Sequence, residues 1–101
     1  MSHDSAVALF AIRADRCPQI LNRLTGLFAQ SDLIPQSVQA RSGDDHMVVR
    51  IIQSGISEHR ASIIAEKMRV IVTVRSVDAE WSDVGVLADR DEGVEAPTVL
   101  A

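Results

Sequence analysis

Residues 15–28 constrain the fold of this chain more than any other stretch. Pro18 has no backbone N–H and a fixed φ, so it suits the first turn of a helix, where that donor would lack a partner. After it, apolar residues recur with the spacing of one face of an α-helix, namely Ile20, Leu21, Leu24, Leu27 and Phe28. The sequence therefore predicts a loop over 13–17 and an amphipathic helix from Pro18 to about Gln30. The N–H groups of its first turn would point into the loop, where a small anion could be held.

Apolar runs and turn signals divide the rest of the chain. The run over 7–12 has the length of a central strand covered on both faces. Strands are also predicted over 34–41, 46–53 and 70–77, and the last has the strongest strand character because it is rich in β-branched residues. The polar cluster at 42–45 predicts a turn that joins 34–41 and 46–53 into a hairpin.

A second helix is predicted after Ser57, which can cap its N-terminus, with Glu58 placed favourably against the helix dipole. Its apolar face consists of Ala61, Ile64, Ala65 and Met68. It ends near 67–69, where Lys67 and Arg69 place cations in the last turn. The resulting order, β-α-β-β-α-β, predicts a ferredoxin-like α+β fold: a four-stranded antiparallel sheet with both helices on one face.

Alternation along two of the strands predicts which side chains face the helices. In 46–53, the apolar set Met47, Val49 and Ile51 alternates with a mixed set that contains Arg50. In 70–77, the apolar set Val70, Val72 and Val74 alternates with a mixed set that contains Arg75 and Val77. The apolar sets are expected to face the helices. The mixed sets, expected on the other face, are too apolar for a solvated surface and indicate a partner, such as a second copy of the chain.

The composition limits the class of protein. A length of 101 residues predicts one domain, over 7–81, between a polar lead-in at 1–6 and an acidic tail at 82–101. The net charge of −4 and the dispersed arginines speak against nucleic acid as a partner. The single cysteine suits a reducing compartment, and no apolar run has the length of a membrane span, so a cytoplasmic protein without a membrane partner is expected.

The order of elements and the loop-proline-helix stretch resemble an ACT domain, the small-molecule-sensing module of amino-acid metabolism. The small regulatory subunit of acetolactate (acetohydroxyacid) synthase is similar over about residues 7–78. The shared positions are Pro18, Leu21, Arg23 and Gly26-Leu27-Phe28 in the first helix, and Lys67-Met68, Ile71 and Val74 later in the chain. The family's glycine after the proline is Gln19 here, and the asparagine two residues before the proline is Arg16.

The resemblance implies a non-catalytic regulatory subunit. Such a subunit forms a homodimer and stabilises or activates a catalytic chain, which itself holds the cofactors, so no cofactor or metal is expected on this chain. An amino-acid effector would meet the loop before the first helix, at Asp15, Arg16, Cys17, Gln19 and Ile20. Because Gln19 adds a side chain where the family has glycine, the expectation of valine feedback is weakened. A free-standing ACT-domain sensor of an amino acid is the alternative.

Each candidate site has a simpler interpretation. The loop at 15–20 would then be a turn that only starts a helix. Arg50, Arg75 and Trp81 are candidates for binding a partner, but the arginines could lie on a solvated sheet and Trp81 could pack on its own domain. His3, His46 and His59 lack metal-ligand spacing and are expected at the surface. Cys17 at a helix start is expected to be a structural residue rather than a reactive thiol.

Overall fold

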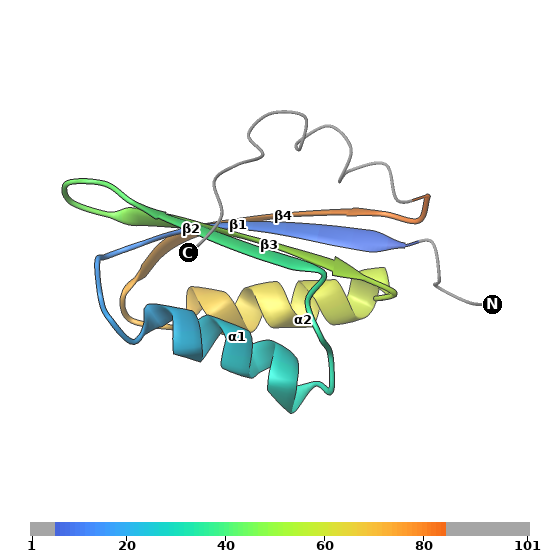
Figure 1. The fold of residues 1–101 in the computed structure, drawn as a ribbon. Helices are drawn as coiled ribbons and strands as arrows, with labels where there is room; N and C mark the ends of the chain where they lie inside the picture. Colours follow the sequence, from blue (N-terminus) through green and yellow to red (C-terminus); the bar gives the residue numbers. More distant parts are fainter. Residues whose placement is uncertain (1–5, 85–101) are drawn as a thin grey trace.

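Two helices cover one face of a four-stranded sheet, and the elements follow the order β-α-β-β-α-β (Figure 1). The structure, a computed structural model, describes residues 6–84. The elements are β1 (Val7–Ala14), α1 (Ile20–Gln30), β2 (Ser37–Ser42), β3 (Met47–Ser54), α2 (Glu58–Arg69) and β4 (Val74–Ser82). This arrangement confirms the predicted ferredoxin-like α+β fold. The expected lead-in and acidic tail fall almost entirely outside the described residues.

The sheet has the strand order β2-β3-β1-β4, and all of its pairs are antiparallel. β1 is therefore central, as the unbroken apolar run over 7–12 predicted. On one side it pairs with β3, from Val7 opposite Ser54 to Ala14 opposite Met47. On its other side it pairs with β4, with Val7 opposite Ser82. Because β1 and β3 are in full register, the end of β1 and the β2–β3 hairpin turn lie at the same end of the molecule.

The helices follow the predicted apolar faces. In α1, Ile20, Leu24 and Phe28 are buried, and the rings of Phe28 and of Phe10 on β1 form a T-shaped pair with a centroid distance of 5.5 Å. α1 begins two residues after Pro18, which lies in the turn before it. In α2, the Ser57 hydroxyl accepts a hydrogen bond from the Arg60 N–H at 3.1 Å, as expected of an N-cap. The buried face of α2 consists of Ala61, Ile64, Ala65 and Met68.

The prediction for the last strand was wrong in its position. β4 begins at Val74 rather than Val70 and continues through Trp81 to Ser82. Val70 caps α2, and Val72 is 91% exposed in the connection that brings the chain from the helix layer to the sheet. The β-branched composition of 70–77 favours a strand locally, but the sheet offers a partner only from Val74 onward, opposite Ala14.

A β-bulge also overturns the predicted faces of this strand. The register shifts between Arg13, opposite Ser76, and Ala14, opposite Val74, so Arg75 is an extra residue without a position in the ladder. As a result, both Val74 and Val77 face the helices, although Val77 was expected on the other face. In β3 the prediction is confirmed, because Met47, Val49 and Ile51 are in the core.

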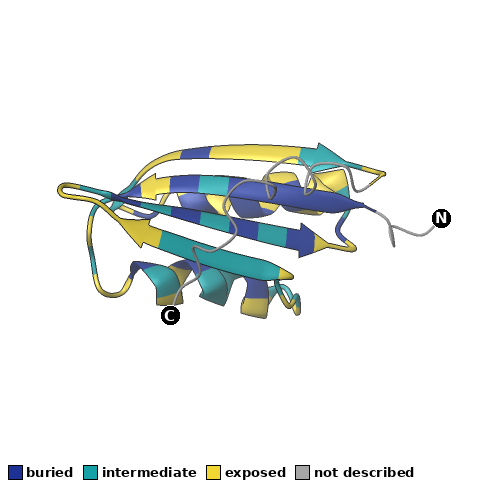
Figure 2. Cartoon of the chain, turned by 45° about the horizontal axis from the view of Figure 1, so that its top comes forward, coloured by how far each residue is buried: buried dark blue, intermediate teal, exposed yellow. Residues whose placement is uncertain are grey.

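The face of the sheet away from the helices, here called the open face, combines apolar and charged side chains. The strands that form it contain buried, intermediate and exposed residues (Figure 2). The registers place the following residues on it: Val7, Leu9, Ala11 and Arg13 of β1, Val48, Arg50 and Ile52 of β3, Ser37, Gln39 and Arg41 of β2, and Ser76, Asp78 and Glu80 of β4. Arg50 lies on this face, as predicted. Leu9 and Val7, both on the central strand β1, are buried.

Candidate functional site

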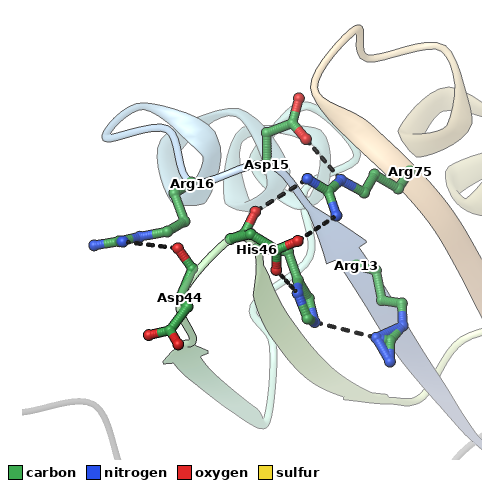
Figure 3. A network of polar contacts seen from close by, with 7 residues as sticks. Arg13, Asp15, Arg16, Asp44, His46 and Arg75 are labelled. Atoms are coloured by element: carbon green, nitrogen blue, oxygen red, sulfur yellow. Dashed lines mark hydrogen bonds and ion pairs between the residues drawn. The ribbon is translucent and has the colours of Figure 1, made fainter.

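The candidate site is the β1–α1 loop together with the hairpin turn between β2 and β3, which the sheet brings to one end of the molecule. The loop follows Ala14, and Ala14 pairs with Met47, the first residue of β3. The backbone of the loop is also tied to the α2–β4 connection, since the Asp15 N–H donates to the Thr73 carbonyl at 2.8 Å. Three connections therefore meet here, and charged side chains join them (Figure 3).

Arg75 links two of these connections to the start of β4. Its Nε donates to Asp15 Oδ1 at 2.7 Å, and its Nη2 donates to the Asp45 carbonyl at 3.0 Å. A longer contact of 3.9 Å joins Arg75 Nη1 and Asp45 Oδ2. The bulge in β4 explains this reach, because it takes Arg75 out of the ladder beside the loop. The guanidinium thus holds the β1–α1 loop and the hairpin turn together.

A second set of contacts fixes the hairpin turn. Arg16 Nη1 donates to the Asp44 carbonyl at 3.3 Å, which is a second bridge between the loop and the turn. His46 Nδ1 lies 2.9 Å from Asp45 Oδ1, and its Nε2 lies 3.2 Å from Arg13 Nη1. Because arginine only donates, neutral His46 accepts from Arg13 at Nε2 and donates to Asp45 from Nδ1.

The charges around Asp45 favour its ionised form. The hydrogen bond from His46 lowers the pKa of the Asp45 carboxyl, and the charges of His46 and Arg75 lower it further. The hairpin turn is therefore held most firmly while Asp45 is ionised.

The other predicted effector residues lie at the start of α1. Gln19 is the N-cap of α1, is exposed, and its side chain makes no capping hydrogen bond. The Ile20 N–H donates to the Cys17 carbonyl at 3.1 Å, and the Cys17 side chain packs against the core. The Ile20 side chain is 1% exposed. A ligand in the loop would therefore meet Asp15, Arg16 and Gln19 rather than the Ile20 side chain.

The three predicted partner-binding residues are not brought together. Arg50 lies near the centre of the open face, and Arg75 lies in the bulge beside the loop. Trp81 is near the far end of β4, where it packs against the core and its Nε1 donates to the Ile56 carbonyl at 2.8 Å. Trp81 thus anchors β4 to the connection between β3 and α2.

Sequence reasoning did not assign a role in this site to Arg13, Asp44, Asp45 or His46. The turn at 42–45 and the loop at 13–17 were both predicted, but as separate features. The pairing of β1 with β3 brings the loop and the turn to the same end of the sheet. Because this pairing follows from the ferredoxin-like topology, the predicted fold could have indicated that the two features are neighbours. In residues 6–84, no group of three or more His, Cys, Asp or Glu side chains is placed to hold a metal ion.

The order of the elements and the two helices on one face of the sheet are those of the ferredoxin-like fold. The family model described as "ACT-like domain" matches residues 1–85. The chain therefore belongs to the ACT-like domain family, whose members are small-ligand regulatory domains. None of the curated proteins matches the sequence.

Solved structures show the same fold at low sequence identity. The ACT domain from GTP pyrophosphokinase of Chlorobium tepidum has a TM-score of 0.64 and 15% identity, over 73% of this chain and 96% of that one. The C-terminal domain of the MgtC protein from Mycobacterium tuberculosis has a TM-score of 0.61 and 9% identity, over 79% and 90% of the two chains. The regulatory subunit of aspartate kinase from Thermus thermophilus has a TM-score of 0.58 and 11% identity, over 82% of this chain and 54% of that one. Within the described part of the chain, no helix is long and apolar enough to cross a membrane.

Proposed function

We propose that this chain is a non-catalytic regulatory subunit that binds the catalytic chain of acetolactate synthase in branched-chain amino-acid biosynthesis. It acts in the cytoplasm as a homodimer and raises the activity or stability of its partner. The resemblance of its first helix to that family, at Pro18, Leu21 and residues 26–28, supports this assignment beyond the ACT-like class.

The observation that carries the regulatory-subunit proposal is that side chains of the chain itself contact the loop and tie it to the hairpin turn and to β4. The first bridge joins Arg75 to Asp15, and the second joins Arg16 to the Asp44 carbonyl. The side chain of Gln19 stands where the family has a glycine that lets an effector approach. Valine feedback through this loop is therefore disfavoured, whereas activation of a catalytic chain needs only the surface of the domain.

Co-expression with a catalytic chain of acetolactate synthase tests the proposal. The two chains are expected to purify together, and the activity of the catalytic chain should rise on addition of this one. Arg75→Ala should weaken the pull-down, because Arg75 is a partner-binding candidate, while Arg41→Ala, an exposed change near the end of β2, serves as the matched control. Absence of both co-purification and activation would refute the proposal.

The alternative is a free-standing sensor of an amino acid. Its support is the family itself, whose members are small-ligand regulatory domains. Calorimetry with the proteinogenic amino acids separates the two functions. A sensor should bind one of them, and Gln19→Trp should weaken that binding. No heat with any of them, together with activation of the catalytic chain, would exclude the sensor.

A further inference from the structure

We propose that the outer edge of β4 and the groove beside it bind an extended, basic segment of another protein, which adds to the sheet as a fifth strand. The groove lies between β4 and α2 and is lined in part by Trp81. Trp81 is near the end of β4, whereas Arg75 and the candidate site are at its start. This surface goes beyond the proposed function, since its use does not depend on which catalytic chain the protein regulates.

The strand register shows which backbone groups of β4 are directed away from the sheet. The Gly55 N–H donates to the Ala6 carbonyl at 2.9 Å, so the backbone groups of Ala6 are directed toward β3. This direction alternates along a strand, so residues 7, 9, 11 and 13 of β1 are directed toward β4, where their partners are residues 82, 80, 78 and 76. The backbone groups of residues 77, 79 and 81 are therefore directed outward, and the sheet of the described residues has no strand beyond β4.

A contact from α2 agrees with this direction and limits the available edge. Arg69 Nη2 donates to the Val77 carbonyl at 3.0 Å, and Nη1 of the same guanidinium donates to Glu66 Oε2 at 2.8 Å. The outward carbonyl of Val77 is thus already satisfied. An added strand would instead pair with the outward N–H and C=O groups of Ala79 and Trp81.

The groove beside this edge has a floor of small side chains. Its volume is about 240 Å³, and Ala61 and Ala65 of α2 line it together with Ala79 of β4. Ala79 is exposed although it shares the helix-facing side of β4 with the core residue Val77. A residue paired with Ala79 would place its side chain on the same side, where the groove has room for valine or another aliphatic side chain.

The charges beside the groove select a basic segment. Asp78 is exposed on the open face, and Glu58 is exposed in the first turn of α2, where it lines the groove. A residue opposite Asp78 would point to the open face with its Cβ about 5 Å away, so a lysine or arginine there could pair with the carboxylate. The net charge of −4 also attracts a basic segment. The expected partner segment therefore alternates aliphatic and basic residues.

A second copy of the chain fits this edge less well. A two-fold arrangement that joins the outward groups of two β4 strands is centred on Ala79 and sets Val77 of each copy opposite Trp81 of the other. Because Arg69 already occupies the Val77 carbonyl, this pairing would lose a hydrogen bond at each end. A foreign segment needs to pair only with Ala79 and Trp81.

Fluorescence anisotropy of a labelled peptide, Lys-Val-Lys-Val-Lys-Val-Lys, with the full 101-residue chain tests the proposal. A few main-chain hydrogen bonds and one side chain in the groove predict weak but saturable binding, with a Kd below about 1 mM. The same peptide with N-methylated valines should bind about fivefold more weakly or worse, because it cannot donate to the carbonyls of Ala79 and Trp81.

A pair of proline variants locates the site on one edge of the sheet. Ala79→Pro removes an outward N–H but no hydrogen bond to β1, so it should raise the Kd by about fivefold while the fold is kept. Ala40→Pro is the matched control on β2, the other edge strand. The Gly43 N–H donates to the His46 carbonyl, so alternation directs the backbone groups of Ala40 away from β3. Ala40→Pro should leave the Kd unchanged.

The charge requirement is tested with a reversed pair. Asp78→Lys should weaken binding of the lysine peptide by about threefold and strengthen binding of Glu-Val-Glu-Val-Glu-Val-Glu by a similar factor. Circular dichroism of each variant verifies folding. The comparison of the two lysine peptides needs no change in the protein, so it holds even where a variant fails to fold.

Each other result overturns the proposal. Absence of saturable binding up to about 1 mM shows that the edge takes no such segment. Equal binding of the N-methylated peptide, or equal losses in Ala79→Pro and Ala40→Pro, shows that the peptide does not pair with β4. Self-association in sedimentation velocity that Ala79→Pro abolishes shows that a second copy occupies the edge. Because no catalytic chain is present, these failures are distinct from a failure of the proposed regulatory function.

Discussion

Breaking the link between Arg75 and Asp15 should loosen the candidate site while the domain remains folded. The Nε–Oδ1 distance is 2.7 Å, and the side chains are 46% and 51% exposed. In water the attraction of such a pair is about 1 kcal/mol at 4 Å, and exposed pairs contribute about 0.2–1 kcal/mol net. Arg75 also donates to the Asp45 carbonyl. We therefore expect Arg75→Met to lower the free energy of unfolding by about 1 kcal/mol.

Urea unfolding of a double-mutant cycle measures the pair itself. The cycle comprises Arg75→Met, Asp15→Asn and the double variant, with Arg23→Met on α1 as the control. The coupling energy should be about 0.5 kcal/mol and should fall at high salt, because exposed charges are screened. Hydrogen exchange should become faster at 15–19 and 43–46 in Arg75→Met, but not in the core of β1. A coupling above about 2 kcal/mol, or one that is insensitive to salt, would refute this account of a solvent-screened bridge.

Three further changes test other contacts. Leu24→Ala, at a fully buried position of α1, should cost about 2–5 kcal/mol in urea unfolding, and a loss under 1 kcal/mol would contradict the core described here. Ser57→Ala should lower the free energy of unfolding by about 1 kcal/mol, and Ser57→Asp should keep the wild-type value, because aspartate also caps helices. No loss in Ser57→Ala would show that the hydroxyl does not cap α2. Because the pKa of Asp45 is lowered in the folded state, its contribution is present above the unfolded value of 3.8 and is lost as the pH falls through the folded-state pKa. In Asp45→Asn, the free energy of unfolding, measured in urea at a series of pH values, should therefore fall less steeply as the pH is lowered. An unchanged pH dependence would show that the contact with His46 is not maintained.

The sequence by itself determined the elements whose signal is local. The apolar spacing after Pro18 predicted the buried face of α1, and Ser57 predicted the start of α2. Alternation in β3 predicted which of its residues enter the core, and the order of the elements predicted the fold class. These features depend on residues close in sequence, so periodicity and capping are sufficient to predict them.

Only the tertiary structure decided the position of β4 and the composition of the candidate site. The valines at 70 and 72 have strand propensity, but the chain leaves α2 there and finds its partner strand only at Val74. The bulge then turns Arg75 toward Asp15, sixty residues away in sequence. Neither event has a local signal, because the register of an edge strand is set by the strand it pairs with, and a bulge changes which side chain reaches the loop.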